Sequence, residues 1–471
     1  MMEEEEEAPS SVLELDISDG PKKVIEMLTQ DNHAEVEKVY LSRAFPSPRR
    51  AVATDKSVAE VLDSIVALPK INHLSVGYAS GSFPIHLLMK ALTHKETIHE
   101  ATKKSSISKL VLLGVKLTPR ESKIAAETIR QARMPLRAVS LESCKSDSST
   151  SASGTNSKRS SPNKPLDVFL GALSTIPLET LSLKTIPAES MHVLAQFPLL
   201  KELSITHMKL SEESLENIGR SKQLEKLELE TITEPKPNQL LQILSRILIG
   251  NTILRFLKWR DIFTESRVVD TEALAAFCEM LQHNNSLHEL RLVAKFRDAL
   301  FGYPIGNVLR YNSTLIQLHI QTKIDPTEKE RTNFLTSMVA IAESLRFNGT
   351  LKSLSFHLSG GMNGQTVDYI SHTFMAPFLE VLREDTQFVL EYLTFEYRSL
   401  GKLALTAELE FYLHLNRIGR RKLLTARNNT TQRDWIDMLV DHRDDISVIF
   451  YFLMLNPPLC QAMALERIGG S

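Results

Sequence analysis

A twelve-residue phrase, L-x-x-N-x-x-L-x-x-L-x-apolar, occurs four times in this chain. The copies are LIGNTILRFLKW at Leu248, LQHNNSLHELRL at Leu281, LRYNSTLIQLHI at Leu309 and LRFNGTLKSLSF at Leu345. With average leucine and asparagine usage, one match is expected about once in a hundred chains of this length. The phrase is therefore a true internal repeat, and it predicts a stacked array rather than three separate globular domains.

The second half of the phrase, apolar-x-x-apolar-x-apolar, recurs along most of the chain. Its copies begin at Val12, Val36, Ile71, Ile107, Leu136, Leu178, Leu200, Leu224, Leu254, Leu287, Leu315, Leu351 and Leu390. Successive copies start 22 to 42 residues apart. This spacing fits one strand and one helix per repeat, with insertions in some repeats.

The side-chain pattern within one repeat predicts which face of each element is buried. In LEKLEL, Leu224, Leu227 and Leu229 are expected to point inward. Glu228 is expected to point to the opposite face, because the side chains of a strand alternate between its two faces. Between strands, Val58, Val61, Leu62, Ile65 and Val66 fall at helical spacing and leave acids and lysine on the other side. Trp259 occupies an inward strand position and is expected in the core.

The repeat resembles the leucine-rich repeat of the ribonuclease-inhibitor-like subclass, in which an Asn-containing turn joins helix to strand. The resemblance covers Val12 to Phe395. It implies an α/β solenoid, a right-handed β-α superhelix whose curved parallel sheet is lined by helices. The family also places Asn or Cys three residues after the last apolar strand position. Here only Cys144 conforms, so no regular asparagine ladder is expected at that position.

Composition divides the chain into five segments. We expect a disordered acidic tail at 1–11, degenerate repeats at 12–142, a disordered Ser/Lys-rich insertion at 143–165, repeats at 166–400 and a helical C-terminal cap at 401–471. The insertion, SCKSDSSTSASGTNSKRSSPNKP, carries too few apolar residues to offset the entropy of folding.

The cap is expected to consist of helices that cover the open apolar end of the array. One helical stripe contains Leu405, Leu409, Tyr412 and Leu413, and another contains Ile446, Ile449, Phe450, Leu453 and Met454. Thr431 to Asp434 resembles a capping box, and the acids of Asp441 to Asp445 are interpreted as helix capping. The basic run Arg417, Arg420, Arg421 and Lys422 is interpreted as a solvated helix end. The segment from LHLNRIGRRKLL to YFLMLNPPLC resembles the C-terminal segment of leucine-rich repeat proteins from diatoms, and this resemblance implies no catalytic residue.

Charge and cysteine usage restrict the partners and the compartment. Lys plus Arg total 55 against 57 Asp plus Glu, a net charge of −2 that disfavours nucleic acid. Three scattered cysteines (Cys144, Cys278 and Cys460) indicate a reducing compartment. MMEEEEEAPSS lacks the features of a signal peptide, and the longest strongly apolar stretch, Ile446 to Leu455, is about half a membrane span. We therefore expect a cytoplasmic protein, with the nucleus left open, that does not bind membranes.

A search for reactive motifs finds none. The chain has neither a Gly-x-Ser-x-Gly elbow nor a His-Glu-x-x-His helix, and GGMNGQT at Gly360 lacks the lysine of a phosphate loop. His283 and His288 are five residues apart, one more than the spacing of metal ligands on one helix face. We expect no catalytic residue, metal, cofactor or small-molecule substrate, and hence no enzyme.

The favoured function is a non-enzymatic interaction scaffold that binds a protein partner on the open strand face. Two alternatives remain: a substrate-recognition subunit of a ubiquitin ligase, and a GTPase-activating protein of the leucine-rich repeat class. Stacking is expected to align Ser182, Ser204, Glu228, Lys258, Arg291 and His319 in one row. The predicted protein-binding residues are Lys226, Phe256, Lys258, Arg260, Glu289, Arg291, Gln317 and His319, and their interpretation as ordinary solvated strand residues stays open.

Overall fold

The structure of the chain is a computed structural model that divides into two compact units, Met1–Ile262 and Phe263–Ser471. We call them unit 1 and unit 2 and describe each by itself. The structure describes residues 12–16, 21–29, 36–43, 55–68, 70–78, 84–93, 107–131, 134–146, 165–264, 266–324, 327–359, 365–384, 389–398, 401–420, 437 and 439–455.

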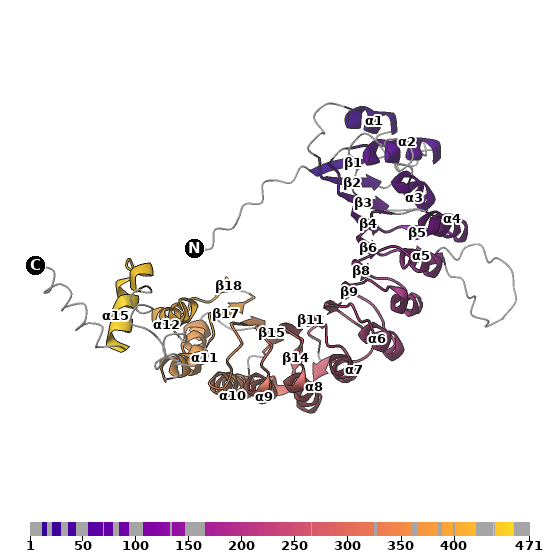
Figure 1. Cartoon of the computed structure of the whole chain (residues 1–471). Helices are drawn as coiled ribbons and strands as arrows, with labels where there is room; N and C mark the ends of the chain where they lie inside the picture. The colour runs from indigo at the N-terminus through magenta and orange to yellow at the C-terminus, as the bar shows by residue number, and fades with distance from the viewer. Residues whose placement is uncertain are drawn as a thin grey trace, which may run out of the picture. The chain divides into compact units, whose positions relative to one another are not determined.

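Unit 1 contains a parallel sheet in which strands neighbour one another in chain order (Figure 1). The strands are β1 (Val12–Asp16), β2 (Lys38–Arg43), β3 (His73–Tyr78), β4 (Lys109–Leu113), β6 (Ala138–Glu142), β8 (Thr180–Lys184), β9 (Glu202–Thr206), β10 (Lys226–Glu230) and β11 (Phe256–Arg260). Each of them carries one copy of the apolar phrase, so the predicted strands of this unit are confirmed.

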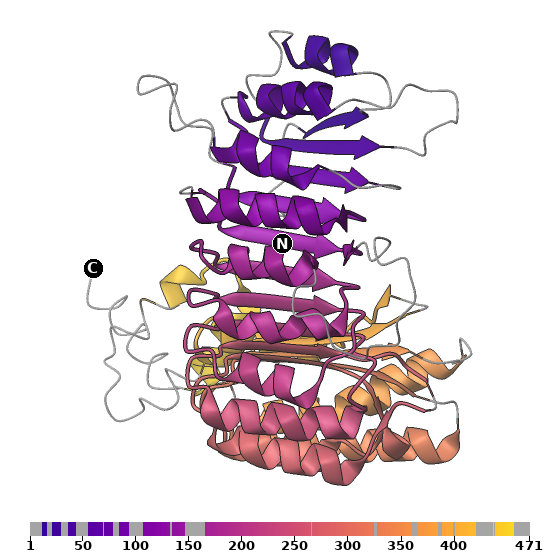
Figure 2. The same ribbon diagram turned by 90° about the vertical axis from the view of Figure 1, so that its right-hand side faces the viewer.

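Helices alternate with these strands and line one face of the sheet (Figure 2). They are α1 (Pro21–Thr29), α2 (Asp55–Val66), α3 (Ile85–Thr93), α4 (Pro119–Gln131), α5 (Pro165–Leu173), the 3-10 helix η4 (Ala188–Gln196), α6 (Glu212–Gly219) and α7 (Pro237–Gly250). The short strands β5 (Lys116–Leu117) and β7 (Lys145–Ser146) pair beside the main sheet. Unit 1 is thus a layered α/β array with helices on one side.

The core of unit 1 lies between the sheet and the helices. Leu227 and Leu229 of β10 are fully buried, whereas Glu228 between them is partly exposed on the other face. Trp259 pairs in register with Leu229 and is also fully buried, as predicted. Burying the apolar phrase on one face of every strand explains why the strands stack, since a single strand and helix cannot enclose these side chains.

A left-handed residue follows each of five consecutive strands in unit 1. These residues are Gly114, Ser143, Thr185, His207 and Thr231, with φ between 53° and 68°. Each donates its backbone N–H to the carbonyl of the last residue in the next strand, as in Ser143 to Lys184 at 2.8 Å. Four of the five are not glycine, and for such residues the left-handed conformation is unfavourable. The hydrogen bond to the neighbouring repeat stabilises the turn in this conformation.

Unit 2 contains strands β13 (Glu289–Val293), β15 (Gln317–Lys323), β16 (Ser353–Ser359) and β17 (Tyr392–Tyr397), which pair in parallel in this order. The helices beside them are α8 (Thr271–His283), α9 (Gly302–Tyr311), α10 (Glu328–Leu345) and α11 (Gln365–Glu384), with the 3-10 turn η5 (Arg297–Ala299) before α9. Short strands β12 (Val268–Val269) and β14 (Lys295–Phe296) pair in parallel outside the main sheet. The phrases from Leu287 to Leu390 therefore also form strands, as predicted.

The asparagine of the long phrase closes the turn between helix and strand. Asn312 is 5% exposed, and its Oδ1 accepts the backbone N–H groups of Thr314 and Leu315. Its Nδ2 donates to the carbonyls of Leu281 and Asn284 in the preceding repeat. Asn251 in unit 1 and Asn348 in unit 2 make the same kinds of bond. The side-chain amide thus satisfies backbone N–H groups of its own turn and forms hydrogen bonds to backbone carbonyls of the preceding repeat.

Two glycines allow α9 to approach α10 closely. A Cβ on Gly302 would lie 2.2 Å from the Cα of Ser337, and one on Gly306 would lie 2.9 Å from the carbonyl oxygen of Ala340. The Ser337 hydroxyl accepts from the N–H of Gly302 at 3.1 Å and donates to Ala299 at 2.8 Å. The glycines and this serine fix the contact between the two helices.

The C-terminal part of unit 2 begins with a strand rather than a helix. β18 (Gly401–Lys402) pairs antiparallel with β17, and α12 (Ala407–Arg417) and α15 (Ile446–Leu455) follow. Asp445 accepts the backbone N–H of Val448 at 3.1 Å, in agreement with the predicted capping role of this acidic run. The predicted capping box at Thr431 to Asp434 lies outside the described residues.

The predicted buried face of α15 is wrong for three of its five residues, while Ile449 and Leu453 are partly buried and pack against the core cluster of this region. Ile446, Phe450 and Met454 are 80%, 64% and 66% exposed, whereas Val448 and Phe452 are fully buried. These two pack in a cluster with Leu415 and Leu439, with aromatic side chains of α12 at its edge. The helix is apolar on nearly every side, so its sequence pattern does not distinguish the face that packs.

Arg420 corrects the interpretation of the basic run as a solvated helix end. Its side chain is 2% exposed, and Nη1 donates to the carbonyl of Leu382 at 2.9 Å. The guanidinium lies over the rings of Tyr412 and Tyr451, 5.1 and 5.2 Å from their centres. Arg417 is exposed and stacks on Tyr392, while Arg421 and Lys422 lie outside the described residues. The run thus includes a buried contact among α11, α12 and α15.

The ends of the predicted Ser/Lys-rich insertion are ordered secondary structure. Lys145 and Ser146 form β7, and Pro165 is the buried first residue of α5. The backbone of β7 pairs with β5, so the repeat extends beyond its main strand. Residues 147–164 of the insertion and the acidic tail at 1–11 lie outside the described residues.

Candidate protein-binding surface

In unit 1, every second strand residue faces away from the helices. The third residues of successive strands are in register, and from β2 to β11 they are Tyr40, Ser75, Val111, Ser140, Ser182, Ser204, Glu228 and Lys258. The predicted row of Ser182, Ser204, Glu228 and Lys258 therefore exists in this unit. We call this side of the sheet the open face of unit 1.

Lys226, Phe256, Lys258 and Arg260 lie together on β10 and β11. Lys226 and Phe256 are in register, and the Lys226 Nζ is 5.1 Å from the centre of the Phe256 ring. Phe256 is partly buried, with this lysine above its ring. Arg260 is exposed at the end of β11.

The lysines of β10 and β11 are paired with glutamates on the same face. Lys226 Nζ is 3.1 Å from Glu228 Oε1, and Lys258 forms an ion pair with Glu230. Because each of these two lysines has a carboxylate within contact distance, this part of the open face carries both signs of charge.

Unit 2 places Glu289, Arg291, Gln317 and His319 on its own open face. Glu289 is in register with Gln317, and Arg291 with His319. Arg291 Nε donates to Glu289 at 2.6 Å, and the Nδ1 of His319 shares a hydrogen bond with the Ser355 hydroxyl. Here too the predicted cation is paired along its own strand, so the four residues form a polar surface of mixed charge.

A second row on the open face of unit 1 was not singled out from the sequence. The first residue of β2 is Lys38, that of β3 is His73 and that of β4 is Lys109, and the three are in register. We call them the basic row. Burial and the positive charges of Lys109 and Lys38 lower the pKa of His73. The signal was present in the sequence, because each residue is the third of its phrase: VEKVYL, INHLSV and ISKLVL.

Tyr40 flanks the basic row. Its ring lies 5.8 Å from that of His73, centre to centre, and the side chain is 37% exposed. Ser75 and Gly77 continue β3 beyond His73 with little or no side chain on the same face. The basic row is therefore bordered by the Tyr40 ring on β2 and by the small residues Ser75 and Gly77 on β3.

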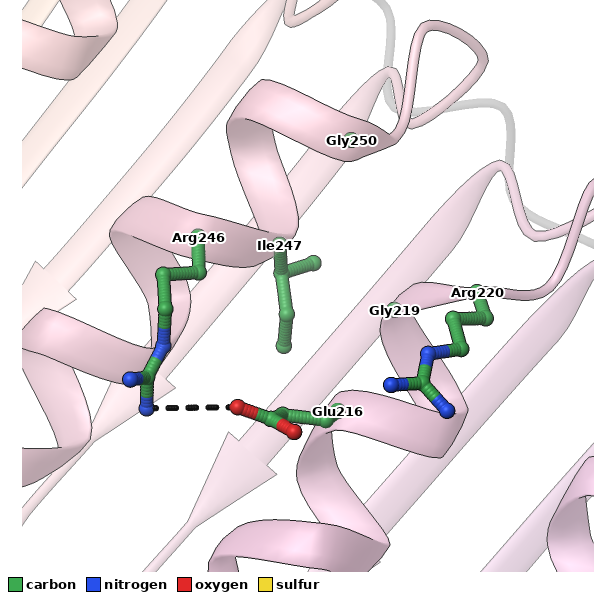
Figure 3. Close-up of a pocket in the computed structure, with 6 residues that line it drawn as sticks. All are labelled: Glu216, Gly219, Arg220, Arg246, Ile247 and Gly250. Carbon is green, nitrogen blue, oxygen red and sulfur yellow. Dashed lines mark ion pairs between the residues drawn. The ribbon is translucent and has the colours of Figure 1, made fainter.

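A pocket of about 260 Å³ lies between α6 and α7 on the helix-lined side of unit 1 (Figure 3). Arg246 and Glu216 point toward one another across it, with 3.4 Å between Nη2 and Oε1, and Arg246 also pairs with Glu212. Arg220 donates to Asn217 at 3.3 Å. Gly219 leaves room for Ile247, whose Cγ1 would lie 2.5 Å from an added Cβ. The arginines of this pocket thus serve contacts between and within the two helices.

The two described cysteines, Cys144 and Cys278, are buried free thiols. Burial raises the pKa of Cys144 to about 12 and also raises that of Cys278. The described part of the chain holds no group of three or more His, Cys, Asp or Glu side chains arranged for a metal ion. Among the described helices, none has the length and apolar composition to cross a membrane.

No family model matches the chain, and no curated protein matches it. Among solved structures, the chain is similar to one described as "Leiomodin-1 Actin-Binding Site 2 (ABS2)". The two are 18% identical, the match covers 35% of this chain and 90% of that one, and the TM-score is 0.22. A likeness this weak supports no conclusion on fold or function.

Proposed function

We propose that this chain is a leucine-rich repeat protein of the ribonuclease-inhibitor-like subclass that binds a protein partner on its open strand faces, without catalytic activity. The observation that carries the proposal is the row structure of unit 1. Strand after strand turns every second side chain away from the helices, so side chains from distant parts of the sequence line up on one continuous surface.

The turn geometry supports the repeat class. Buried asparagines at Asn251, Asn312 and Asn348 each close a turn and donate to the repeat before. This is the role that an Asn-containing turn between helix and strand would have in such a family.

The residues proposed to contact the partner are Lys226, Phe256, Lys258 and Arg260 in unit 1 and Glu289, Arg291, Gln317 and His319 in unit 2. Lys226 and Arg291 are partly exposed, and each is paired with a glutamate of its own strand. Exposed pairs of this kind contribute little to stability, so these two cations can exchange their glutamates for a group on another protein. Phe256 beneath Lys226 adds apolar area at the same place. Such a combination of aromatic and paired charge suits a polar protein interface.

The test uses charge reversal on opposite sides of unit 1. Lys258→Glu with Arg260→Glu changes the open face, and Arg246→Glu breaks an exposed ion pair on the helix-lined side and serves as the matched control. Both variants are first checked for an unchanged melting curve and then used to capture partners from native extract, with identification by mass spectrometry.

We expect partners that bind the wild-type chain and the Arg246→Glu chain to be lost from the open-face variant. Arg291→Glu tests unit 2 in the same way. If the folded open-face variants recover the same partners with the same efficiency as wild type, these faces are not the recognition surface.

A further inference from the structure

Large apolar side chains lie exposed on two neighbouring helices of unit 2, α9 and α10 (Figure 1). Tyr303 and Tyr311 of α9 are each 63% exposed, and Val339 of α10 and Phe347 in the turn after it are 42% and 61% exposed. On each helix the two residues are eight positions apart, a spacing that keeps both on one face. We call these four side chains the helix-side patch. Exposed apolar side chains gathered in this way mark interaction sites more often than singly scattered ones do.

The two helices run in step, so the helix-side patch has two ends. Gly302 of α9 lies against Ser337 of α10, and farther along the guanidinium carbon of Arg310 is 4.3 Å from the centre of the Phe347 ring. These two contacts place the first tyrosine of the patch near the level of the valine, and the second tyrosine near the level of the phenylalanine. Each end therefore combines an aromatic side chain of α9 with an apolar side chain of the α10 segment.

One end of the helix-side patch carries a cation. Arg310 stacks on Phe347, and no carboxylate of the described residues forms an ion pair with it. Between the two ends the exposed residues are Asn307 and Glu343, and the Oε2 of Glu343 is already 2.8 Å from the Nε of Arg346. Charge complementarity therefore favours a partner that brings a carboxylate to the Arg310 end.

The dimensions of the helix-side patch fit one further helix. Eight residues of an α-helix rise about 12 Å, and the axes of packed helices are about 8–10 Å apart. A third helix laid along α9 and α10 can meet both ends of the patch with side chains seven or eight residues apart in its own sequence. Because helices bond their backbone groups internally, this surface offers no strand edge to an extended segment.

The exposed area of the helix-side patch sets the strength of such a contact. An aromatic side chain that can bury about 200 Å² and is three-fifths exposed offers about 120 Å², so the patch offers about 400 Å² in all. This is half of the roughly 800 Å² that one partner contributes to an interface of standard size. We therefore expect a weak complex, with a dissociation constant of about 10–100 µM.

We propose that the helix-side patch binds an acidic amphipathic helix of another protein. The apolar side chains of that helix pack on the two ends of the patch, and a carboxylate beside one of them pairs with Arg310 above the Phe347 ring. This surface is separate from the open faces, so it gives the chain a second place to hold a protein partner.

Two synthetic helical peptides of about 20 residues serve as probes for the full chain. Both carry leucines at the same positions seven residues apart, and their charged positions are all glutamate in the acidic peptide and all lysine in the basic peptide. Fluorescence anisotropy of the labelled peptides is expected to show binding of the acidic peptide and at least about tenfold weaker binding of the basic one. Equal affinities for the two peptides, or no binding of the acidic peptide at about 1 mM, would overturn the proposal.

Variants of exposed residues locate the contact. Arg310→Glu should weaken binding of the acidic peptide at least about tenfold and strengthen that of the basic peptide, and Tyr303→Ala with Phe347→Ala should weaken both. Arg246→Glu, the same change of charge on the helix-lined side of unit 1, is the matched control and should leave both affinities unchanged. All chains are first compared by their melting curves. If Arg310→Glu and Arg246→Glu bind the acidic peptide equally well, the contact lies elsewhere and the proposal fails.

Sedimentation velocity over a range of protein concentrations tests whether a second copy of the chain occupies the patch instead. We expect a monomer throughout. A dimer that is lost on changing Tyr303 and Phe347 to alanine would show that the patch joins two copies, and would overturn the proposal. The variant Lys258→Glu, Arg260→Glu of the open face leaves the helix-side patch unchanged, so either proposal can fail without the other.

Discussion

Replacing Asn312 with alanine tests how strongly the turns tie neighbouring repeats together. Its Nδ2 donates to the carbonyls of Leu281 and Asn284 at 2.7 and 3.0 Å, and its Oδ1 accepts from the N–H groups of Thr314 and Leu315 at 3.0 and 2.8 Å. Alanine removes all four hydrogen bonds. At roughly 1 kcal/mol net for each bond, the free energy of unfolding falls by about 4 kcal/mol, or by about 2 kcal/mol if water replaces half of them.

Asn285→Ala is the matched control, because Asn285 is an exposed asparagine in the equivalent turn of the preceding repeat. Urea denaturation followed by far-UV circular dichroism compares the two variants, and hydrogen exchange measures the amide of Leu315. We expect a clearly lower midpoint and faster exchange at Leu315 for Asn312→Ala, and little change for Asn285→Ala. Equal midpoints for both variants with unchanged exchange at Leu315 would refute the reasoning.

Three further predictions follow from backbone and burial. Gly302→Ala places a Cβ against the Ser337 backbone and should destabilise unit 2 by about 1–3 kcal/mol, whereas Gly250→Ala, with open space around it, should not; equal urea midpoints would contradict this contact. Thr231→Gly should have a free energy of unfolding about 0.5 kcal/mol higher than Thr231→Ala, since the relief of left-handed backbone strain exceeds the entropy that glycine adds to the unfolded chain, and the opposite order would contradict it. Because burial raises the pKa of Cys144 to about 12, thiolate forms first in the unfolded chain, so the free energy of unfolding should fall between about pH 9 and pH 12; a Cys144→Ala, Cys278→Ala chain with the same pH dependence would argue against this.

The strands were predictable because the apolar phrase has a period of two and recurs. Leu227, Leu229 and Trp259 are buried where alternation placed them. The same reasoning failed for α15, since an almost wholly apolar helix shows no preferred side in its sequence. There the partner side chains Leu415 and Leu439 decide that Val448 is buried.

The candidate surface was predictable in register but not in electrostatics. Strand spacing placed Glu228 beside Lys258 correctly. Which carboxylate each lysine contacts depends on side-chain conformation, and so the pairing of Lys258 with Glu230 was not visible in the sequence. Burial of Arg420 was missed for a related reason: its contacts come from Leu382 and Tyr451, which are distant in sequence.

The left-handed turns of unit 1 bear on how such an array can lengthen during evolution. The backbone N–H of Ser143, after β6, donates to Lys184 of β8, and that of Thr185, after β8, donates to Thr206 of β9, so a duplication with both breakpoints at these turns reproduces this hydrogen bond in the added repeat. In unit 2, β17 is followed by the antiparallel β18, and Leu403 donates back to Phe395. A gene that gains repeats is therefore expected to gain them upstream of β17, because the edge beyond it is occupied by the chain's own return.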